Sequence, residues 1–358
     1  MDCKAFLQRL SEAPGISGYE QVIREMVTEE FQKYADDIRT DKMGSVIALR
    51  RGQGPEPRRR ILLAGHMDEI GMMVSKIEEG FLHIAEVGGI DARILPGLEV
   101  MVHGKKDLPG IVGTRPPHVQ SPGERERVTP MDELLVDVGL SPEEVGRWVR
   151  VGDLVSFRRP FTALQGDWAA GKAFDDRVGV VVVGAALANL ADSWKHSWDV
   201  YGVATCQEEV TFMGAITTAY GIRPDIGIAI DVTFGSMTES GDAETYAMGG
   251  GPGIGYGPNV HPKVYEMLVE TAKALEIPYQ VEALPRGSGT DAWEIQVSRE
   301  GVPTGVIGVP LRYMHTPVET VCMKDIERAG RLLAGFIARL DDKTMEQLTP
   351  RLDAESGS

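Results

Sequence analysis

The sequence predicts an α/β fold, with a mostly parallel, helix-covered sheet into which a small β domain is inserted. Two observations carry this prediction. From Gly171 onward, apolar segments of strand length alternate with segments of helical periodicity, as in a parallel sheet covered by helices. From about Glu69 to Leu164 the pattern changes to short β-type segments separated by Gly-Gly and Pro-Gly pairs. That change is typical of a small all-β unit.

The expected domains follow from these two patterns. We expect a larger domain from residues 1–68 and 165–345, an inserted domain from residues 69–164, and a polar tail from residues 346–358. In the larger domain, Ser17-Gly18-Tyr19-Glu20 fits a capping box that opens a helix reaching about Tyr34. Further expected elements are a helix at 2–10, strands at 46–49, 61–64, 200–206, 226–230 and 302–309, and helices at 177–190, after 214, at 260–275 and at 326–340.

The composition of the 358 residues is that of a globular protein, with 42% hydrophobic and 25% charged residues. The formal charge of −16 disfavours sequence-independent binding to nucleic acid, because such binding needs a basic surface. No apolar segment is long enough to span a membrane, and the N-terminus lacks a signal-peptide pattern. Cys3, Cys206 and Cys322 are far apart and form no CxxC pair, so we expect reduced thiols in a cytoplasmic protein.

Several metal-binding or acid–base side chains follow expected strands at their C-terminal ends. Sites in open α/β sheets form at this edge, so side chains that are distant in sequence can converge there. A further acid lies at the N-terminus of the apolar helix 177–190. These residues are His66, the adjacent pair Glu208-Glu209, Asp231 and His315 at the strand ends, and Asp175 before the helix.

Two histidines and several carboxylates suit Zn²⁺, Co²⁺ or Mn²⁺. A bridging carboxylate could hold two such ions about 3.5–4 Å apart, as in two-metal hydrolases. Asp68 lies two residues after His66 and could accept the ring N–H of that histidine. Glu208 and Glu209, if they lie on an extended segment, point to opposite sides and need not share one task.

Each of these residues also has an ordinary structural explanation. Glu208 and Glu209 could be an exposed pair that opens a helix, where the helix dipole favours acids. Asp175 and Asp231 could cap helices, and a lone histidine is more often a satisfied polar residue than a ligand. The coincidence of all these residues at one sheet edge favours a site.

The residues in these positions resemble the glutamyl, or deblocking, aminopeptidases of the tetrahedral type, a family with dinuclear metal sites. Phe174 stands where the family pattern has an aliphatic residue, and Phe234 where His or Leu is common; neither is an expected ligand. The matching stretches occur in family order and span nearly the whole chain. They are Gly65-His66-Met67-Asp68-Glu69-Ile70-Gly71, Ala173-Phe174-Asp175-Asp176-Arg177, Gln207-Glu208-Glu209-Val210, Ile230-Asp231-Val232-Thr233, Gly249-Gly250-Gly251-Pro252, Gly289-Thr290-Asp291-Ala292 and Arg312-Tyr313-Met314-His315-Thr316-Pro317-Val318-Glu319.

The resemblance implies a role for each site residue. Glu208 would be the general base and acid, and Asp68 would orient His66. The larger domain would be zinc-exopeptidase-like, residues 69–164 would form a PDZ-like dimerisation domain, and dimers would assemble into a tetrahedral homododecamer. The implied ligands of two divalent ions, Zn or Co with Mn as an alternative, are His66 and Asp231 for one, Glu209 and His315 for the other, and Asp175 as the bridge.

We therefore predict a cytoplasmic metallo-aminopeptidase that removes N-terminal residues from peptides by a metal-activated water, with Glu208 as general base. Two alternatives stay open. One is a glycosidase that uses a carboxylate pair such as Glu208 and Asp231, and the other is a non-catalytic assembly protein on a hydrolase fold. The preferred N-terminal residue is not predicted, because Asp242 and Glu244 could line a pocket for basic side chains or lie in a solvated loop.

Overall fold

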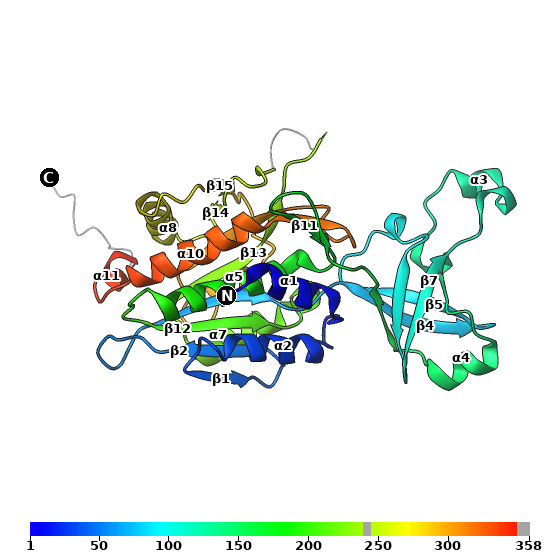
Figure 1. Cartoon of the computed structure of the whole chain (residues 1–358), viewed down its shortest axis with the longest axis horizontal. Helices are drawn as coiled ribbons and strands as arrows, with labels where there is room; N and C mark the ends of the chain where they lie inside the picture. Colours follow the sequence, from blue (N-terminus) through cyan, green and yellow to red (C-terminus); the bar gives the residue numbers. More distant parts are fainter. Residues whose placement is uncertain (239–244, 349–358) are drawn as a thin grey trace.

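The computed structural model describes residues 1–238 and 245–348, which form a larger α/β unit and a smaller β-barrel side by side along the longest axis (Figure 1). The chain leaves the larger unit after residue 66 and returns to it before residue 162, so the barrel is an insertion. The limits 69–164 remain a prediction, although all the barrel strands fall between them.

Four parallel strands form the centre of the sheet in the larger unit. They are, in spatial order, β12 (Asp199–Thr205), β3 (Arg60–His66), β13 (Ile226–Phe234) and β16 (Thr304–Arg312). Parallel neighbours need long crossover connections, and the helices between these strands supply them. Thr205 pairs with His66, and Asp231 pairs with Gly308. The C-terminal ends of the four strands therefore meet at one edge of the sheet.

The outer strands pair mostly antiparallel, so the expectation of a mostly parallel sheet is wrong outside the centre. A short connection explains only the pairs of strands that are consecutive along the chain, because strands joined by a short turn form hairpins and cannot be parallel. The remaining antiparallel pairs join strands that are far apart in sequence. The outer strands are β1 (Asp37–Thr40) and β2 (Val46–Arg50) beside β12, β17 (Glu319–Cys322), β11 (Trp168–Gly171) and β10 (Thr162–Ala163) beyond β16, and β14 (Gly253–Tyr256) and β15 (Gln280–Ala283), which branch from β16.

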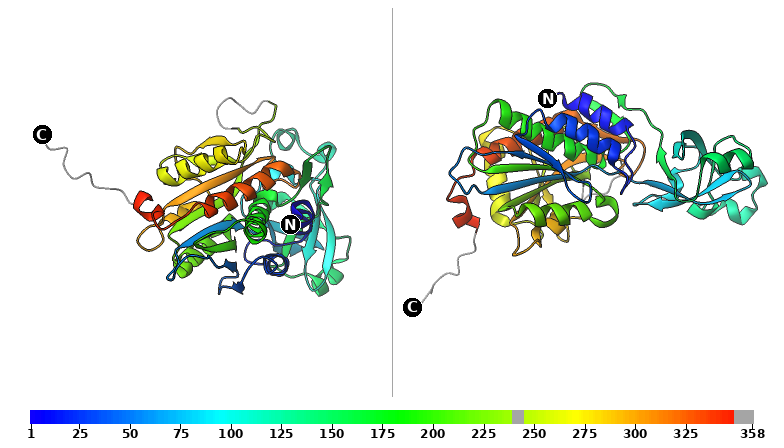
Figure 2. Two further views of the ribbon diagram at one scale, coloured as in Figure 1. Left: turned by 60° about the vertical axis from the view of Figure 1, so that its left-hand side comes forward. Right: turned by 90° about the horizontal axis from the view of Figure 1, so that it is seen from below.

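Helices cover both faces of this sheet (Figure 2). They are α1 (Cys3–Glu12), α2 (Gln21–Phe31), α5 (Phe174–Asp192), α6 (Glu208–Thr211), α7 (Met213–Ile222), α8 (Pro262–Ala274), α9 (Ala292–Gln296), α10 (Met323–Ala338) and α11 (Thr344–Leu348). Between residues 178 and 188, α5 is apolar and buried on all sides beneath α1 and α10. On the opposite face, α7 and α9 pack on Leu62 and Val203. Among the described residues, no helix is both long enough and apolar enough to cross a bilayer.

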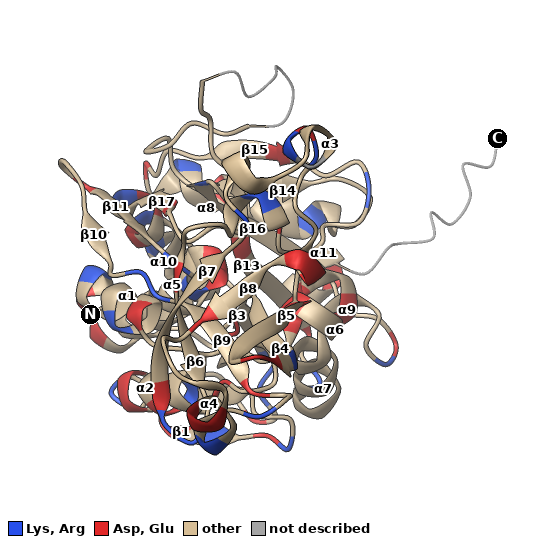
Figure 3. Ribbon diagram, turned by 90° about the vertical axis from the view of Figure 1, so that its right-hand side faces the viewer, with Lys and Arg blue, Asp and Glu red and all other residues tan. Residues whose placement is uncertain are grey.

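The smaller unit is a closed barrel with the strand order β4–β5–β8–β7–β6–β9. Alternate residues of β7 are buried, the period expected of a strand with one face in a core. Figure 3 views the molecule from the barrel side and shows Lys and Arg interspersed with Asp and Glu along the ribbon. The elements are β4 (Gly71–Glu78), β5 (Phe81–Val87), η1 (Ala92–Ile94), β6 (Glu99–His103), β7 (Asp107–Gly113), η2 (Pro117–Val119), α3 (Pro122–Arg125), η3 (Met131–Glu133), β8 (Leu135–Asp137), α4 (Pro142–Trp148) and β9 (Leu154–Phe157).

The capping box expected at Ser17 to Glu20 is not formed. Helix α2 begins one residue after Glu20, and the hydroxyl of Ser17 donates instead to a carboxylate oxygen of Asp68. Glu20 Oε1 accepts hydrogen bonds from the backbone N–H groups of Gly18 (2.6 Å) and Gln207 (3.2 Å). A serine hydroxyl can bond to a distant side chain as readily as to the nearby backbone. For Ser17 the partner is Asp68, which belongs to the predicted site.

A buried ion network lies where the barrel joins the larger unit. Glu69 Oε2 is 2.6 Å from Lys172 Nζ, and Glu69 Oε1 is 3.2 Å from Arg177 Nη2. Burial raises the pKa of Glu69, but the charges of Lys172 and Arg177 outweigh this effect and hold that pKa below its usual value. Burial lowers the pKa of Lys172 to about 8. The carboxylate is therefore the counter-charge of two enclosed cations.

Replacing Glu69 with Ala is expected to destabilise the protein by about 3–5 kcal/mol, because Lys172 and Arg177 would stay buried without their partner. Thermal unfolding followed by circular dichroism measures this change. The control is Glu78→Ala, which removes an exposed carboxylate from Lys76 in β4 and is expected to leave the unfolding midpoint nearly unchanged. Equal midpoints for the two variants would show that the network does not stabilise the fold.

Candidate active site

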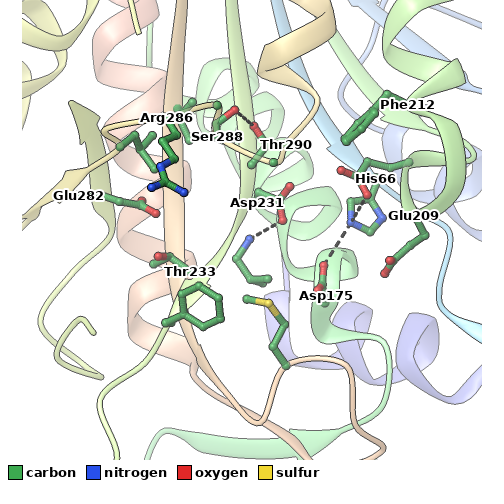
Figure 4. Close-up of a pocket in the computed structure, with 18 of the residues that line it drawn as sticks. His66, Asp175, Glu209, Phe212, Asp231, Thr233, Glu282, Arg286, Ser288 and Thr290 are labelled. Atoms are coloured by element: carbon green, nitrogen blue, oxygen red, sulfur yellow. Dashed lines mark hydrogen bonds and ion pairs between the residues drawn. The ribbon is translucent and has the colours of Figure 1, made fainter. Parts of the chain in front are cut away.

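The predicted site residues meet at the C-terminal edge of the central strands (Figure 4). His66 is the last residue of β3. Asp231 is expected from the sequence just after the end of its strand. It lies instead within β13, because Val232 and Thr233 continue to pair with β16. Its Oδ1 accepts a hydrogen bond of 2.7 Å from the backbone N–H of Val232. Asp231 thus reaches the site from within a strand.

Asp175 lies between the two histidines. Its Oδ1 is 3.2 Å from His66 Nε2, and its Oδ2 is 3.3 Å from His315 Nε2. The residue belongs to a non-helical first turn of α5, where the peptide bond to Asp176 is cis. One carboxylate therefore presents a separate oxygen to each imidazole, as a ligand that bridges two ions would.

Glu208 and Glu209 open the short helix α6. The extended segment considered from the sequence is therefore not formed. The backbone N–H groups of both glutamates donate to Asp68, over 3.0 Å to Oδ1 and 3.2 Å to Oδ2 respectively. The two side chains nevertheless diverge. Glu208 Oε2 is 3.6 Å from His66 Nε2, and Glu209 Oε2 is 3.5 Å from His315 Nε2. Neighbours in sequence thus reach different halves of the site.

The second ring nitrogen of each histidine faces an oxygen acceptor. His315 Nδ1 is 2.8 Å from the carbonyl oxygen of Gly89. That oxygen can only accept, so Nδ1 carries a proton, and Nε2 is the nitrogen that could bind a metal ion in place of its own proton. His66 Nδ1 is 3.5 Å from Asp68 Oδ1, longer than an ordinary hydrogen bond. Gly89 follows β5 of the barrel, so the inserted segment contributes a contact to the site.

More carboxyl groups gather in this site than the two histidines could balance if all of them were ionised. Burial raises the pKa of Glu208 to about 10. It also raises the pKa values of Glu209 and Asp231 well above their usual range. Burial acts in the same direction on Asp175, but hydrogen bonds from the two histidines outweigh it and lower the pKa of that carboxyl. Divalent cations would offset this buried charge.

The donor atoms are also close enough for metal binding. Their set of imidazole nitrogens and carboxylate oxygens fits divalent zinc-like ions. The sequence did not assign Asp176 to the site. Its two carboxylate oxygens accept hydrogen bonds from the backbone N–H groups of His66 (3.2 Å) and Gly179 (2.9 Å), so both oxygens already have a protein partner. Two groups have ligand atoms within 4.8 Å of one another: His66, Asp175 and Glu209 form one, and His66, Asp176 and Asp231 the other.

Glu319 supports the site, although the sequence did not single it out. Its Oε2 accepts hydrogen bonds from the backbone N–H groups of Phe174 (2.6 Å) and Asp175 (3.1 Å), and its Oε1 from that of His315 (2.9 Å). Glu319 therefore ties together the two segments that carry Asp175 and His315. It stands in a matched stretch four residues after His315, and that position is the signal that could have found it.

Several residues in and around the site have positive φ angles, which are uncommon for residues other than glycine. Left-handed conformations cost roughly 1–3 kcal/mol each and persist where the surrounding structure imposes them. Propensity alone would not predict them here. Five such residues belong to the site or lie within three residues of it: Ala173, Gln207, Phe212, Tyr313 and His315, with φ between 52° and 61°.

The site opens into a cavity of about 720 Å³, whose side away from the histidines is lined by β15 and the segment that follows it (Figure 4). Of the two departures from the family pattern, Phe234 is exposed and lines this cavity, whereas Phe174 is buried in the core. Asp242 and Glu244, considered for this pocket from the sequence, lie outside the described residues.

Comparison with known proteins supports one family throughout. A family model described as M42 glutamyl aminopeptidase matches residues 44–332. The chain is 35% identical over 340 residues to the lysyl aminopeptidase of Pyrococcus furiosus, a match that covers 93% of this chain and 96% of that protein.

Solved structures agree with this match. A TET aminopeptidase from a marine sediment archaeon of the Thaumarchaeota has a TM-score of 0.92 and 36% identity, over 97% of this chain and 99% of that chain. The TET1 peptidase of Pyrococcus horikoshii, which can assemble into a tetrahedron or a large octahedral shell, has a TM-score of 0.82 and 32% identity, over 95% and 100%. Because the matched residues include the barrel and the predicted site, the chain belongs to the M42 glutamyl aminopeptidase family, which confirms the resemblance seen in its motifs.

Proposed function

We propose that this M42 aminopeptidase uses two divalent metal ions, with Glu208 as the proton acceptor, to hydrolyse the first peptide bond of its substrates. The observation that carries the proposal is Asp175, whose two oxygens face His66 and His315 separately. A carboxylate placed in this way suits a bridge between two ions. Zn²⁺ or Co²⁺, with Mn²⁺ as an alternative, suits the mixed nitrogen and oxygen donors.

Each ion would have its own ligands and share one. When bound, the ions supply Lewis acidity toward the scissile carbonyl and toward water. The residues that would hold them are His66 and Asp231 for one ion, Glu209 and His315 for the other, and Asp175 for both.

Glu208 would take the proton from the attacking water and return it to the leaving amine. Its oxygen lies 3.6 Å from His66 Nε2, at the edge of the same half of the site. Burial, with a contribution from the neighbouring carboxylates, raises its pKa to about 10, and nearby cations would lower that pKa toward the range of a useful base. Asp68 would support this group in two ways, because it accepts the backbone N–H of Glu208 and faces His66 Nδ1.

Glu208→Gln keeps the side-chain shape and removes the basic oxygen, so kcat is expected to fall about 10²–10⁴-fold with metal retained and KM little changed. Glu209→Gln is expected instead to weaken metal binding, and excess metal should partly restore its rate. Measuring kcat together with metal stoichiometry for both variants checks this difference. Loss of metal from Glu208→Gln alone would reverse the two roles.

His315→Ala is expected to lower metal content and activity together, because it removes a nitrogen ligand beside Asp175. Inductively coupled plasma mass spectrometry gives the metal content, and refilling stripped protein with Zn²⁺, Co²⁺ or Mn²⁺ identifies the ion that supports turnover. His83→Ala, in β5 of the barrel, is the matched control. Wild-type metal content and activity in His315→Ala would remove this histidine from the site.

The barrel would be a PDZ-like dimerisation domain, and dimers would build a tetrahedral homododecamer. The TET1 peptidase of Pyrococcus horikoshii, which assembles into closed shells, matches this chain over nearly its whole length. The barrel also exposes large apolar side chains, including Phe81, Ile111, Val119 and Val128. These side chains are therefore candidates for the proposed dimer contact, which contiguous apolar surface would mark.

Replacing residues 72–161 with a short linker is expected to yield a smaller oligomer, because it removes the proposed dimerisation surface. Light scattering coupled to size-exclusion chromatography measures the mass of both proteins. A full-length protein that is a monomer would contradict the assembly, whatever its activity.

The two alternatives from the sequence gain less support. A glycosidase that relies on a carboxylate pair needs no imidazoles, whereas both histidines here face one carboxylate. A non-catalytic assembly protein would have no use for Glu208 beside His66. Hydrolysis of an aminoacyl anilide that stops on chelation and resumes with added metal would exclude both.

A further inference from the structure

A row of glycines beside the site leaves room for the side chain of another strand on one face of the sheet. Asp231 in β13 pairs with Gly308 in β16, and Gly308 pairs with Gly253 in β14. Residues that pair across strands point to the same face. Asp231 therefore points to the same face of the sheet as Gly308 and Gly253. We call these two glycines the glycine floor; it extends from β13 to β15, which pairs with the far side of β14.

The side chain of Glu282, from β15, reaches across this floor. A Cβ added at Gly308 would lie 2.2 Å from Glu282 Oε2, and one added at Gly253 would lie 2.8 Å from it. Figure 4 shows the carboxylate pointing into the cavity on the side of Asp231. Since neighbouring strands lie about 4.8 Å apart, the carboxylate is roughly one strand spacing from Asp231.

The carboxylate of Glu282 is not fully satisfied by the protein. The residue is 7% exposed, and its Oε2 has no hydrogen-bond partner among the described residues. Burial raises the pKa of this carboxyl to about 7, against the effect of a hydrogen bond from the Thr233 hydroxyl. A buried polar atom without a partner is costly, so a cationic ligand in the cavity would stabilise the charged form.

The other charged residues around the cavity have proposed tasks at the metal centre. Among the described lining residues, Glu282 and Arg286 remain. Arg286 is exposed on the segment after β15, and no ion pair joins it to Glu282 in the described part of the chain. A charge acts more strongly where water is excluded. The buried acid rather than the exposed guanidinium therefore sets the preference of this end of the cavity.

We propose that Glu282 binds the cationic side chain of the substrate's N-terminal residue, so that peptides beginning with lysine or arginine are preferred. This inference rests on the proposed aminopeptidase function. The aliphatic stem of a lysine would lie along Leu284 and Val306, which line the cavity, while its ammonium meets the Glu282 carboxylate. The two glycines leave room for this carboxylate beside the cavity, because a Cβ at either position would meet it.

The test compares kcat/KM of the holoenzyme for lysyl, norleucyl, leucyl and glutamyl p-nitroanilides. Norleucine has the carbon stem of lysine without its ammonium group. Wild type is expected to favour lysyl over norleucyl by about 30-fold or more, because a buried charge pair is lost without the ammonium. Glu282→Gln is expected to bring this ratio near one, by lowering the lysyl value and raising the norleucyl value. Glu270→Gln, which loses an equal charge on the exposed face of α8, is the control and should keep the wild-type ratio.

A wild-type ratio near one overturns the proposal without any variant, even if Glu282→Gln fails to fold. Equal losses for every substrate in Glu282→Gln would assign the carboxylate to the α-amine and overturn its side-chain role. A glutamyl preference that Arg286→Gln abolishes would assign the pocket to Arg286 instead. Hydrolysis without a cationic preference rejects only the role of Glu282, whereas a wild-type holoenzyme that cleaves none of the anilides rejects the proposed function itself.

Discussion

The contact of Asp175 with two imidazoles is the constraint on which the rest of the site depends. One histidine ends β3 and the other follows β16, and β13 lies between these strands. The three parallel strands must therefore end at one edge before a single carboxylate can reach both rings. Glu319 then holds the backbone of Asp175 and of His315 at once, so neither segment can move without the other.

Burial gives this arrangement its chemistry. Carboxylates enclosed together resist ionisation, and the pKa values of Glu208, Glu209 and Asp231 all rise for that reason. Asp68 keeps a lowered pKa instead: burial raises it, but His66, the Ser17 hydroxyl and a backbone N–H outweigh that effect. The site thus combines Asp68, whose contacts favour the charged form, with acids that need added positive charge, and divalent ions would provide that charge.

The sequence predicts that His66 and His315 meet because parallel strands place their ends at a common edge, although Asp231 reaches that edge from within its strand. It predicts the family from motifs whose order and spacing span nearly the whole chain. It does not predict that the Ser17 hydroxyl bonds to Asp68 instead of capping a helix, because a local motif does not show which distant residues the fold brings near. Glu282 is beyond sequence reasoning for a related reason. An acid in a short outer strand looks solvent-exposed until the glycines across from it are seen to admit its side chain.

Gly253 and Gly308 lie beside Glu282, so a related enzyme could change the pocket at these positions and keep the site itself. A methyl group at Gly253 or Gly308 would meet the Glu282 carboxylate directly, and would displace it without contacting His66 or Asp175. During evolution, single substitutions on this floor could therefore shift the accepted residue from long to short, or from charged to neutral, while hydrolysis continued. Diversification of such a family needs no new scaffold, only small changes in volume along one row of paired residues.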